Sequence, residues 1–407
     1  MAGERDTVLV IGGGVAGATA ALELAAQGAE VTLVEKDDFL GGHAARLACK
    51  ALEACQKCNG CLSEARLAEL LESPRVRLLR RATVSGLERR GDGFLASIDQ
   101  RPAYIDPQRC TGCGICRERC PAAEEGALRS PLLAGDLPRL AIDPAVCLYF
   151  KDGRSTMCRD LCPEEAIDFD RPAARIEVQA RAVVLASGFQ PYEAGQKERL
   201  GHGRLPNVIT ALELEDRLRR LGSPARPSDG RLPQRVAFIQ CVGSRERLGH
   251  NYCSRVCCGY ALRLGRMLGD RFGSQVSVFY MDLQSFGLAM DDFLAAARQD
   301  LDLVRSMPYD VYAGKDGGVL VEYQAEPGQA PVQRPFDLLV LSVGMTPGRD
   351  NPELAQTLGL ELDHHGFLRS GPGVFVAGAA ARPMDVAEVV AHAGRAARDT
   401  LRYLEAS

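Results

Sequence analysis

The chain has 407 residues, 46% of them hydrophobic and 25% charged, so it is an ordinary globular sequence long enough for two or three domains. Its net charge of −4 at pH 7 provides no basic surface, and nucleic acid is therefore not an expected partner. The sequence contains no uninterrupted run of about 18 apolar residues and no N-terminal export pattern, so neither a membrane span nor secretion is expected.

Fifteen cysteines, most of them in tight clusters, are the unusual feature of this composition. In a large chain without an export signal, clustered cysteines indicate metal or cluster ligation rather than disulfides. We therefore expect a cytoplasmic protein whose thiols serve as ligands.

The first predicted element is an apolar strand that runs into a glycine-rich loop, TVLVIGGGVAG, at residues 7–17. The loop has G-x-G-x-x-G spacing, a helix follows it as far as Gly28, and a second strand ends at Glu35. In such a unit the glycines let the backbone approach a pyrophosphate, and the acid accepts a ribose hydroxyl. An ordinary tight strand–helix turn is the alternative. The candidate cofactor-binding residues here are Gly12, Gly14, Val15, Ala16, Gly17, Glu35, Lys36 and Gly42.

A cysteine cluster with the spacing C-x5-C-x2-C-x2-C follows this unit, at Cys49, Cys55, Cys58 and Cys61. The spacing is compatible with a [4Fe-4S] cluster close to the dinucleotide site. Four thiolates suit zinc equally well, so zinc and free thiols remain alternatives.

Residues 110–121, CTGCGICRERCP, have the spacing C-x2-C-x2-C-x3-C-P of bacterial ferredoxins that hold [4Fe-4S] clusters. The Cys-Pro ending and the lack of histidine disfavour zinc. In two-cluster ferredoxins the ligand sets cross, so we expect one cluster to be held by Cys110, Cys113, Cys116 and Cys162.

The second half of this ferredoxin pattern lacks one ligand. Cys120, Cys147 and Cys158 remain for a second cluster, and Ser155 stands where a fourth thiol is expected. One hypothesis is that Cys241 completes the set; a three-cysteine cluster and a cluster that uses Ser155 are the alternatives.

Two later strands complete the expected first nucleotide-binding fold. Residues 180–192 form a strand that ends in a small-residue turn at Ser187 and Gly188, and residues 373–381 form another that contains Gly378. We add these three residues to the cofactor-binding candidates. The acid that usually follows the last strand is replaced by Ala379.

Between these strands, residues 235–283 predict a second βαβ-like unit, which closes with a strand at 336–347. Its first strand, VAFIQCVGSR, ends in Gln240 and Cys241 and offers only Gly243 to a nucleotide phosphate. We therefore expect that an NAD(P)H site has been lost. The following NYCSRVCC brings Cys253, Cys257 and Cys258 to the start of a helix, as reactive or ligating thiols or as buried small residues.

In order, GGGVAG, CTGCGICRERCP, VVLASGFQPY, FIQCVGSR, NYCSRVCC and LLVLSVGMTP resemble the heterodisulfide reductase HdrA family over nearly the whole chain. The resemblance implies an α/β fold, a thioredoxin-reductase-like flavoprotein with two dinucleotide folds and an inserted α+β ferredoxin-like domain. This chain is shorter than the long archaeal members of the family, and in this respect it also resembles QmoA, the flavin-bearing component of the quinone-interacting membrane-bound oxidoreductase. Arg263 stands where bifurcating members tend to have a lysine near the flavin, so Arg263 is a further cofactor-site candidate.

The resemblance divides the chain into five segments. We expect an FAD-binding domain in three parts, at residues 1–100, 172–230 and 348–407. The inserted [4Fe-4S] domain is expected at residues 101–171, and the degenerate NAD(P)H-like domain at residues 231–347.

The expected function is that of an electron-transfer oxidoreductase subunit with FAD and two or three [4Fe-4S] clusters. The resemblance implies that it works with other subunits of a redox complex, either heterodisulfide-reductase-like or quinone-interacting, with membrane contact only through a partner. The alternatives are a flavin-bifurcating subunit with soluble partners, a stand-alone NAD(P)H-dependent disulfide reductase and a redox sensor or scaffold.

Overall fold

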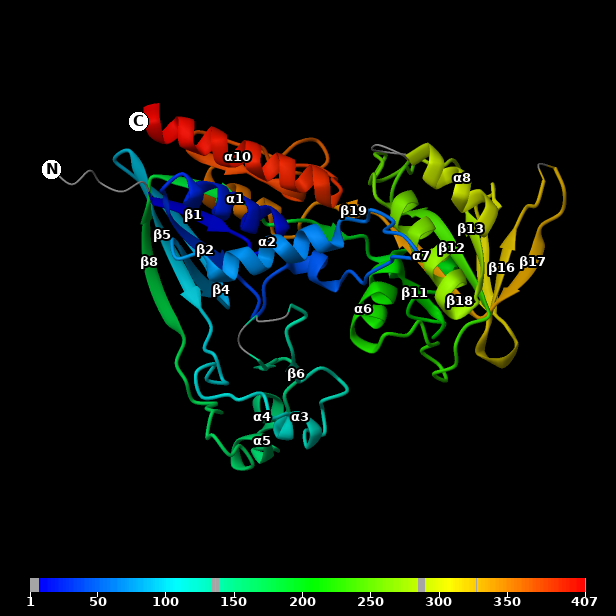
Figure 1. Ribbon diagram of the computed structural model, residues 1–407, viewed down its shortest axis with the longest axis horizontal. Coiled ribbons are helices and arrows are strands. Elements are labelled where there is room, and N and C mark those ends of the chain that lie inside the picture. The colour runs from blue at the N-terminus through cyan, green and yellow to red at the C-terminus, as the bar shows by residue number, and fades with distance from the viewer. Residues whose placement is uncertain (1–6, 134–135, 137–138, 285–289, 327, 407) are drawn as a thin grey trace.

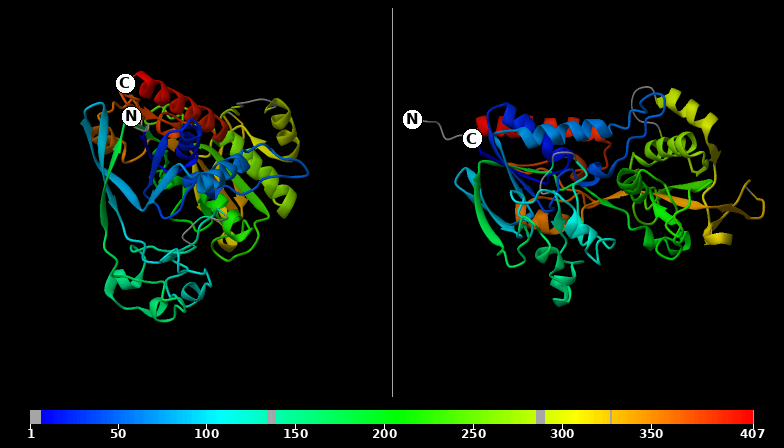
Figure 2. Two further views of the ribbon diagram at one scale, coloured as in Figure 1. Left: turned by 60° about the vertical axis from the view of Figure 1, so that its left-hand side comes forward. Right: turned by 60° about the horizontal axis from the view of Figure 1, so that its bottom comes forward.

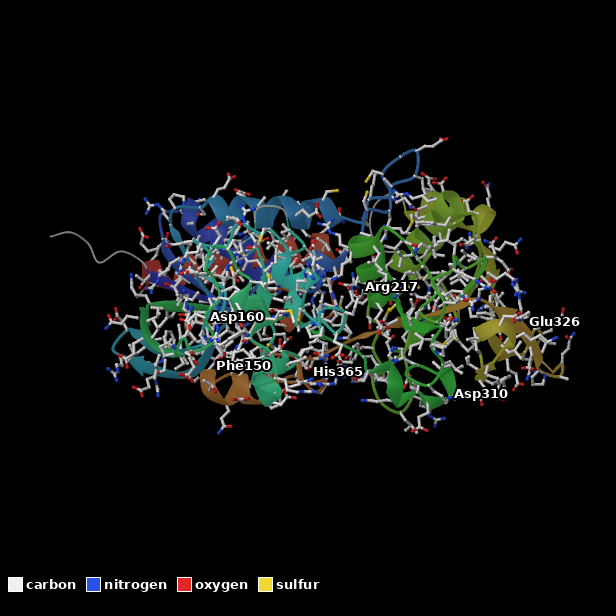
Figure 3. The ribbon with its side chains drawn as sticks, turned by 90° about the horizontal axis from the view of Figure 1, so that it is seen from below. Phe150, Asp160, Arg217, Asp310, Glu326 and His365 are labelled. Atoms are coloured by element: carbon white, nitrogen blue, oxygen red, sulfur yellow. The ribbon has the colours of Figure 1, made fainter. Side chains whose placement is uncertain are left out.

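The computed structural model describes residues 7–133, 136, 139–284, 290–326 and 328–406. Two bodies lie side by side along the longest axis, each built on a five-stranded sheet, and a smaller body hangs below the first (Figure 1). Figure 3, seen from below, shows Phe150 and Asp160 of this smaller body in front of the first body and Glu326 at the opposite end of the molecule.

The first body is built on a parallel sheet whose strands come from three separate parts of the chain. Its strand order is β20-β9-β1-β2-β3, with β1 (Thr7–Ile11), β2 (Glu30–Glu35), β3 (Val76–Arg80), β9 (Ala182–Leu185) and β20 (Val374–Val376). After the half-buried Thr7, the residues of β1 are all apolar and buried because layers cover both faces of the sheet.

Helices cover one face of this sheet and an antiparallel sheet covers the other. Val8 and Val10 of β1 pack with the helices, whereas Leu9 and Ile11 pack with the antiparallel sheet. The covering elements are α1 (Val15–Ala26), α2 (Gly60–Glu72), α10 (Val386–Ala406), β4 (Ala82–Arg90), β5 (Gly93–Gln100) and β8 (Ala174–Ala180).

The second body repeats this three-layer arrangement. Its parallel sheet has the order β11-β18-β12-β13-β14, with β11 (Val208–Thr210), β12 (Arg235–Val242), β13 (Gln275–Phe279), β14 (Asp302–Val304) and β18 (Leu338–Val343). Its covering elements are α6 (Ala211–Leu221), α7 (Cys257–Phe272) and α8 (Met290–Asp300) on one face and β15 (Asp310–Ala313), β16 (Val319–Tyr323) and β17 (Val332–Phe336) on the other.

Short elements join the two bodies. A two-stranded antiparallel ribbon pairs β10 (Gln190–Pro191) with β19 (Met345–Thr346), so that the chain passes between the bodies twice at one place. The remaining short elements are η1 (Gly42–Arg46), η2 (Ala194–Gln196), η3 (Glu198–Leu200), η4 (Lys315–Gly317), α9 (Asn351–Leu358) and η5 (Gly378–Ala380).

The smaller body is inserted between β5 and β8, which pair antiparallel and place Gln100 opposite Ala174 at the point of insertion. It contains α3 (Ile115–Glu118), β6 (Leu128–Arg129), β7 (Ala141–Ile142), α4 (Leu148–Asp152) and α5 (Met157–Asp160). Its core combines apolar side chains with buried cysteines, and Tyr149 stacks on Phe169 at 4.1 Å between ring centroids. Most of this body lies below the first body (Figures 1 and 2), and the Leu132 carbonyl accepts a 2.8 Å hydrogen bond from Arg219 of the second body.

Charged side chains join the inserted segment to the first body. The Asp136 carboxylate is buried and lies 2.6 Å from the Arg80 guanidinium, and it also accepts a hydrogen bond from Leu40 N. Arg129 pairs with Asp38 at 2.5 Å and with Asp37 at 2.9 Å. These ion pairs fix the insert against the loop that follows β2.

Candidate functional site

A glycine-lined cradle lies where β1 and β9 end. Gly12 has φ +109°, and a Cβ atom on it would lie 2.3 Å from Ala186 O. A Cβ on Gly17 would lie 1.8 Å from Gly12 O. By contrast, a Cβ on Gly14, the N-cap of α1, would meet no atom within 4 Å. The backbone is tightly packed beneath the loop and open at the helix N-terminus, which is the shape that a dinucleotide pyrophosphate requires.

Glu35 lies beside this cradle at the end of β2. Its Oε2 accepts a 2.6 Å hydrogen bond from Gly13 N, and its Oε1 accepts a 2.8 Å bond from Asp37 N. Burial raises the pKa of the carboxyl group, while the two backbone donors favour the charged form. Each carboxylate oxygen keeps a further lone pair, so Glu35 can still accept a ribose hydroxyl.

The structure brings the other predicted cradle residues to the same place. A Cβ on Gly42 would lie 3.9 Å from Gly14 Cα, and a Cβ on Gly378 would lie 2.5 Å from the Ala16 Cβ. Val15 and Ala16 are buried in the first turn of α1, and a Cβ on Gly188 would face open space. The residues assembled here are Gly12, Gly14, Val15, Ala16, Gly17, Glu35, Gly42, Ser187, Gly188 and Gly378.

Lys36 and Arg263 make other contacts. Lys36 is exposed and pairs with Asp350 at 3.0 Å. Arg263 lies in α7, and its Nε donates a 2.7 Å hydrogen bond to Gln56 O in the first cysteine cluster. Burial lowers the pKa of the Arg263 guanidinium, while Cys58, Asp385 and Cys55 act in the opposite direction. Arg263 therefore supports the loop of residues 49–61.

Two histidines that the sequence does not single out line the cradle. The His43 ring lies 4.7 Å from the Phe189 ring, and its Nε2 is 3.1 Å from Phe189 O. Burial lowers the pKa of His43. His392 of α10 accepts a 3.0 Å hydrogen bond at Nδ1 from Gly378 N, which holds the turn after β20 against that helix.

Four predicted ligands line one hollow of the inserted body: Cys110, Cys113, Cys116 and Cys162. The hollow contains about 360 Å³ of empty space, part of it open to solvent. Burial and the proximity of Cys110, Cys113 and Cys162 raise the pKa of Cys116 to about 11. Ala166 N lies 3.3 Å from Cys162 Sγ as a hydrogen-bond donor. The side chains present suit a thiolate-ligated cluster whose irons offset the crowded negative charge.

A second thiol set lies in the same body. Burial, together with nearby Cys147, Cys116 and Cys120, raises the pKa of Cys158 to about 11. The structure thus brings Cys120, Cys147 and Cys158 together, as the crossed ferredoxin pattern predicts. Ser155 lies between α4 and α5 and is half-buried.

The loop of residues 49–61 presents Cys49, Cys55 and Cys61 at the surface and Cys58 partly buried. Two buried polar side chains hold this loop. Lys50 pairs with Glu215 of α6 at 2.6 Å, and the Gln56 side chain donates to Lys50 O. The loop starts in the first body but packs on α6 and α7 of the second (Figure 1).

Cys241 belongs to a different set from the one predicted. One hypothesis placed it beside Cys120, Cys147 and Cys158, but burial and nearby Cys258 and Cys253 raise its pKa to about 11. Burial, Cys241, Cys258 and Cys253 also raise the pKa of Cys257. Backbone N–H groups of Arg255 and Gln284 lie 3.3 and 3.4 Å from Cys253 Sγ and Cys258 Sγ. We name Cys241, Cys253, Cys257 and Cys258 the four-thiol set.

The four-thiol set forms because α7 follows β12 in a βαβ unit, which faces the helix N-terminus toward the end of the strand. Cys241 has φ +58°, beside an irregular register between Ile239 and Val242. The spacing C-x11-C-x3-C-C, taken as one pattern, is the sequence signal that we missed.

The loop that follows β12 packs closely against neighbouring side chains at Gly243. Gly243 packs so closely on Tyr192 that a Cβ on it would lie 2.0 Å from the ring. Gly243 N donates a 3.3 Å hydrogen bond to the Glu246 carboxylate. A ring and an anion therefore occupy the position where a nucleotide fold approaches its phosphates.

Within residues 7–133, 136, 139–284, 290–326 and 328–406, no group of three or more His, Cys, Asp or Glu side chains is arranged to hold a metal ion. In the same part of the chain, no helix combines the length and the apolar character needed to cross a membrane.

A protein-family model described as FAD dependent oxidoreductase matches residues 7–229, more than half of the chain. The chain belongs to the FAD dependent oxidoreductase family. The expected oxidoreductase class and the FAD cofactor are thereby confirmed. The open helix N-terminus, the clash-prone glycines and Glu35 are features of this flavoprotein that fit the ADP half of FAD.

Curated relatives confirm the resemblance to the heterodisulfide reductase HdrA family. The HdrA component of the H(2):CoB-CoM heterodisulfide,ferredoxin reductase of Methanothermobacter marburgensis is 32% identical, and the alignment covers 96% of this chain and 63% of that protein. The iron-sulfur HdrA component of the CoB--CoM heterodisulfide reductase of Methanocaldococcus jannaschii is 34% identical, with the same coverage of both chains. The flavoprotein thus spans less than two thirds of the length of these relatives.

Solved thioredoxin reductases share the fold and confirm the predicted fold class. The enzyme of Lactococcus lactis, in its FR conformation, superposes with a TM-score of 0.54 at 16% identity, covering 99% of this chain and 100% of that one. The enzyme of T. acidophilum gives a TM-score of 0.54 at 15% identity, covering 99% of each chain.

Proposed function

We propose that this flavoprotein is the electron-transfer subunit of a multi-subunit complex related to heterodisulfide reductase, and that it carries [4Fe-4S] clusters beside its FAD. One observation carries the proposal. All fifteen cysteines fall into four groups: the loop of 49–61, the hollow of Cys110, Cys113, Cys116 and Cys162, the set of Cys120, Cys147 and Cys158, and the four-thiol set. A protein that used cysteine merely as a small apolar residue has no reason to crowd its thiols in this way.

FAD supplies the conversion between two-electron and one-electron transfer. The chain's own residues bind and orient it. The amides at the start of α1 would bind the pyrophosphate, and Glu35 would accept the ribose hydroxyls. Ser187, Gly188 and Gly378 line the rest of the cradle, so three separate segments of the chain contribute to one FAD domain.

The thiol groups supply the proposed cluster ligands. Thiols with raised pKa values must lose protons when they bind iron, so burial reserves them for a cationic partner. Three groups offer four sulfurs each. The set of Cys120, Cys147 and Cys158 offers three, with Ser155 as the candidate for the fourth position, and zinc remains the alternative for the loop of 49–61.

Relatives named as subunits support the proposal that electrons enter and leave through partner proteins. The partners we propose are other subunits of a redox complex, and any membrane contact is made by them. The crowded loop at Gly243 disfavours the alternative of a self-contained NAD(P)H-dependent disulfide reductase.

Iron analysis of paired cysteine variants tests the ligand sets. We expect anaerobically purified protein to contain iron and acid-labile sulfide, and Cys113→Ser/Cys116→Ser to lose about four irons, the content of one [4Fe-4S] cluster. Cys253→Ser/Cys257→Ser should lose a separate set of similar size. The matched control is Ser85→Ala, an exposed position on β4, which should keep full iron and flavin content. Iron-free wild-type protein, or variants with unchanged iron, would contradict the proposal.

Rapid mixing with nicotinamide coenzymes tests the route of the electrons. NADH and NADPH should leave the flavin absorbance unchanged, whereas dithionite should bleach it. Fast bleaching by either coenzyme would favour the disulfide-reductase alternative.

A further inference from the structure

A partly buried tyrosine lies beside Cys257 of the four-thiol set. Tyr260 is in the first turn of α7, three residues after Cys257, and its hydroxyl donates a 3.0 Å hydrogen bond to Val343 O. Cys257 Sγ lies 3.7 Å from the same carbonyl oxygen. The Tyr260 hydroxyl and the Cys257 thiol therefore approach one acceptor, and they are hydrogen-bonding neighbours of each other.

Two more polar side chains, on the strands that α7 covers, have side-chain atoms without a hydrogen-bond partner. Gln240 and Ser342 are both fully buried on the adjacent strands β12 and β18, whose register pairs Ile239 with Leu341. Strand alternation places them on the sheet face that Phe238 and Val340 turn toward α7. Both polar atoms of the Gln240 side chain lack a hydrogen-bond partner. Ser342 Oγ comes close to the Tyr260 hydroxyl without meeting hydrogen-bond geometry.

Buried polar groups without partners are costly, by about 1–3 kcal/mol each, and call for an explanation. Phenylalanine at 260 and apolar residues at 240 and 342 would pack as well between a sheet and a helix. Polar side chains at all three positions, next to a ligand candidate, are explained if their hydrogen bonds serve a charged group that the thiols hold. We name Tyr260, Gln240 and Ser342 the polar floor.

We propose that the polar floor positions hydrogen-bond donors under the cluster of the four-thiol set and raises its reduction potential, with Tyr260 O–H turning from Val343 O to Cys257 Sγ. The inference rests on the proposed function. Reduction adds one electron to the cluster and transfers no proton, so Tyr260 keeps its hydrogen. Hydrogen bonds to the sulfurs stabilise the added negative charge, which is why the potential rises.

An EPR-monitored redox titration of Tyr260→Phe tests the proposal on anaerobically purified protein. Removal of one charge-assisted hydrogen bond should shift the reduction equilibrium of this cluster about tenfold toward the oxidised form. For a one-electron couple, this shift lowers the reduction potential by about 59 mV. Iron content, flavin content and the signals of the other clusters should stay unchanged. The matched control is Tyr309→Phe, which removes a hydroxyl bonded to Gln324 outside the set.

The outcomes separate the two proposals. An unchanged potential in a Tyr260→Phe protein with full iron content would overturn the role of the polar floor and leave the proposed function intact. Wild-type iron content in Cys253→Ser/Cys257→Ser would overturn the cluster itself. If Tyr260→Phe fails to fold, Gln240→Met carries the same test: a lowered potential supports the polar floor, and an unchanged one overturns it.

Discussion

At the scale of single residues, the flavin cradle depends on a missing side chain. Gly12 combines a positive φ of +109° with a close approach to Ala186 O, and either condition alone would disfavour other residues. Gly28 has a similar φ of +95°, but a Cβ on it would meet no atom within 4 Å. A substitution at Gly28 therefore introduces backbone strain alone, whereas one at Gly12 introduces both strain and a steric clash.

Gly12→Ala should abolish stoichiometric FAD binding, because the new methyl group forces β1 and β9 apart at the point where the pyrophosphate binds. Gly28→Ala, the matched control, should cost only about 1–2 kcal/mol of stability from its left-handed backbone and keep FAD. The ratio of flavin to protein absorbance and the thermal midpoint measure both effects. Full FAD content in Gly12→Ala would contradict the expected role of this position.

At the scale of elements, α6 shows how local sequence begins a helix. Thr210 Oγ1 accepts a 3.2 Å hydrogen bond from Glu213 N, and the Glu213 carboxylate accepts a 2.5 Å bond from Thr210 N. Burial opposes ionisation of Glu213, but these bonds and the one to His202 lower its pKa overall. This capping box starts the helix whose Glu215 reaches the loop of residues 49–61.

Thr210→Ala should lower the free energy of unfolding by about 1 kcal/mol, the usual contribution of an N-cap. Because the folded-state pKa of Glu213 is lowered, its contribution is present above the unfolded value of 4.5 and is lost as pH falls through the folded pKa. The difference between Thr210→Ala and wild type should therefore shrink in acid. Urea denaturation at pH 7 and at lower pH measures it, with the exposed Thr83→Ala as control. A difference that grows in acid would be inconsistent with this cap.

At the scale of the whole molecule, the loop of residues 49–61 ties the two bodies together. Lys50 and Glu215 form an ion pair with side chains 2% and 4% exposed, and Ala48 N donates a 2.9 Å hydrogen bond to the same carboxylate. Arg271 of α7 donates to Ala51 O at 2.5 Å. On the other side, Arg255, before α7, pairs with Glu388 of α10 at 2.6 Å. These contacts join the second body to the loop of residues 49–61 and to α10 of the first body.

Lys50→Met should destabilise the protein by about 3–5 kcal/mol, because it leaves the Glu215 carboxylate buried without its partner. Lys50→Met/Glu215→Met should recover most of this loss, since apolar residues of similar volume often replace a buried pair at little cost. Guanidinium denaturation compares the two variants. Equal loss in both would show that the ion pair is not what holds the loop.

Short-range pattern was enough for the parts of this protein whose chemistry depends on neighbours in the sequence. The G-x-G-x-x-G loop and Glu35 lie within one βαβ unit, so their spacing already implied the cradle. The run from Cys110 to Cys116 likewise brings its thiols together within a few residues, and the structure lines one hollow with them. The family resemblance and the fold class came from several such strings in order, and the relatives confirm both.

Only the tertiary structure decided which distant residues meet. Cys241 joins Cys253, Cys257 and Cys258 because α7 packs on the sheet with its N-terminus near the end of β12, a contact that we did not infer from the spacing of these residues. Lys50 finds Glu215, and Tyr260 reaches Val343, across loops and layers. Local patterns follow from backbone geometry over a few residues, whereas these contacts depend on how whole layers pack, to which every buried side chain contributes.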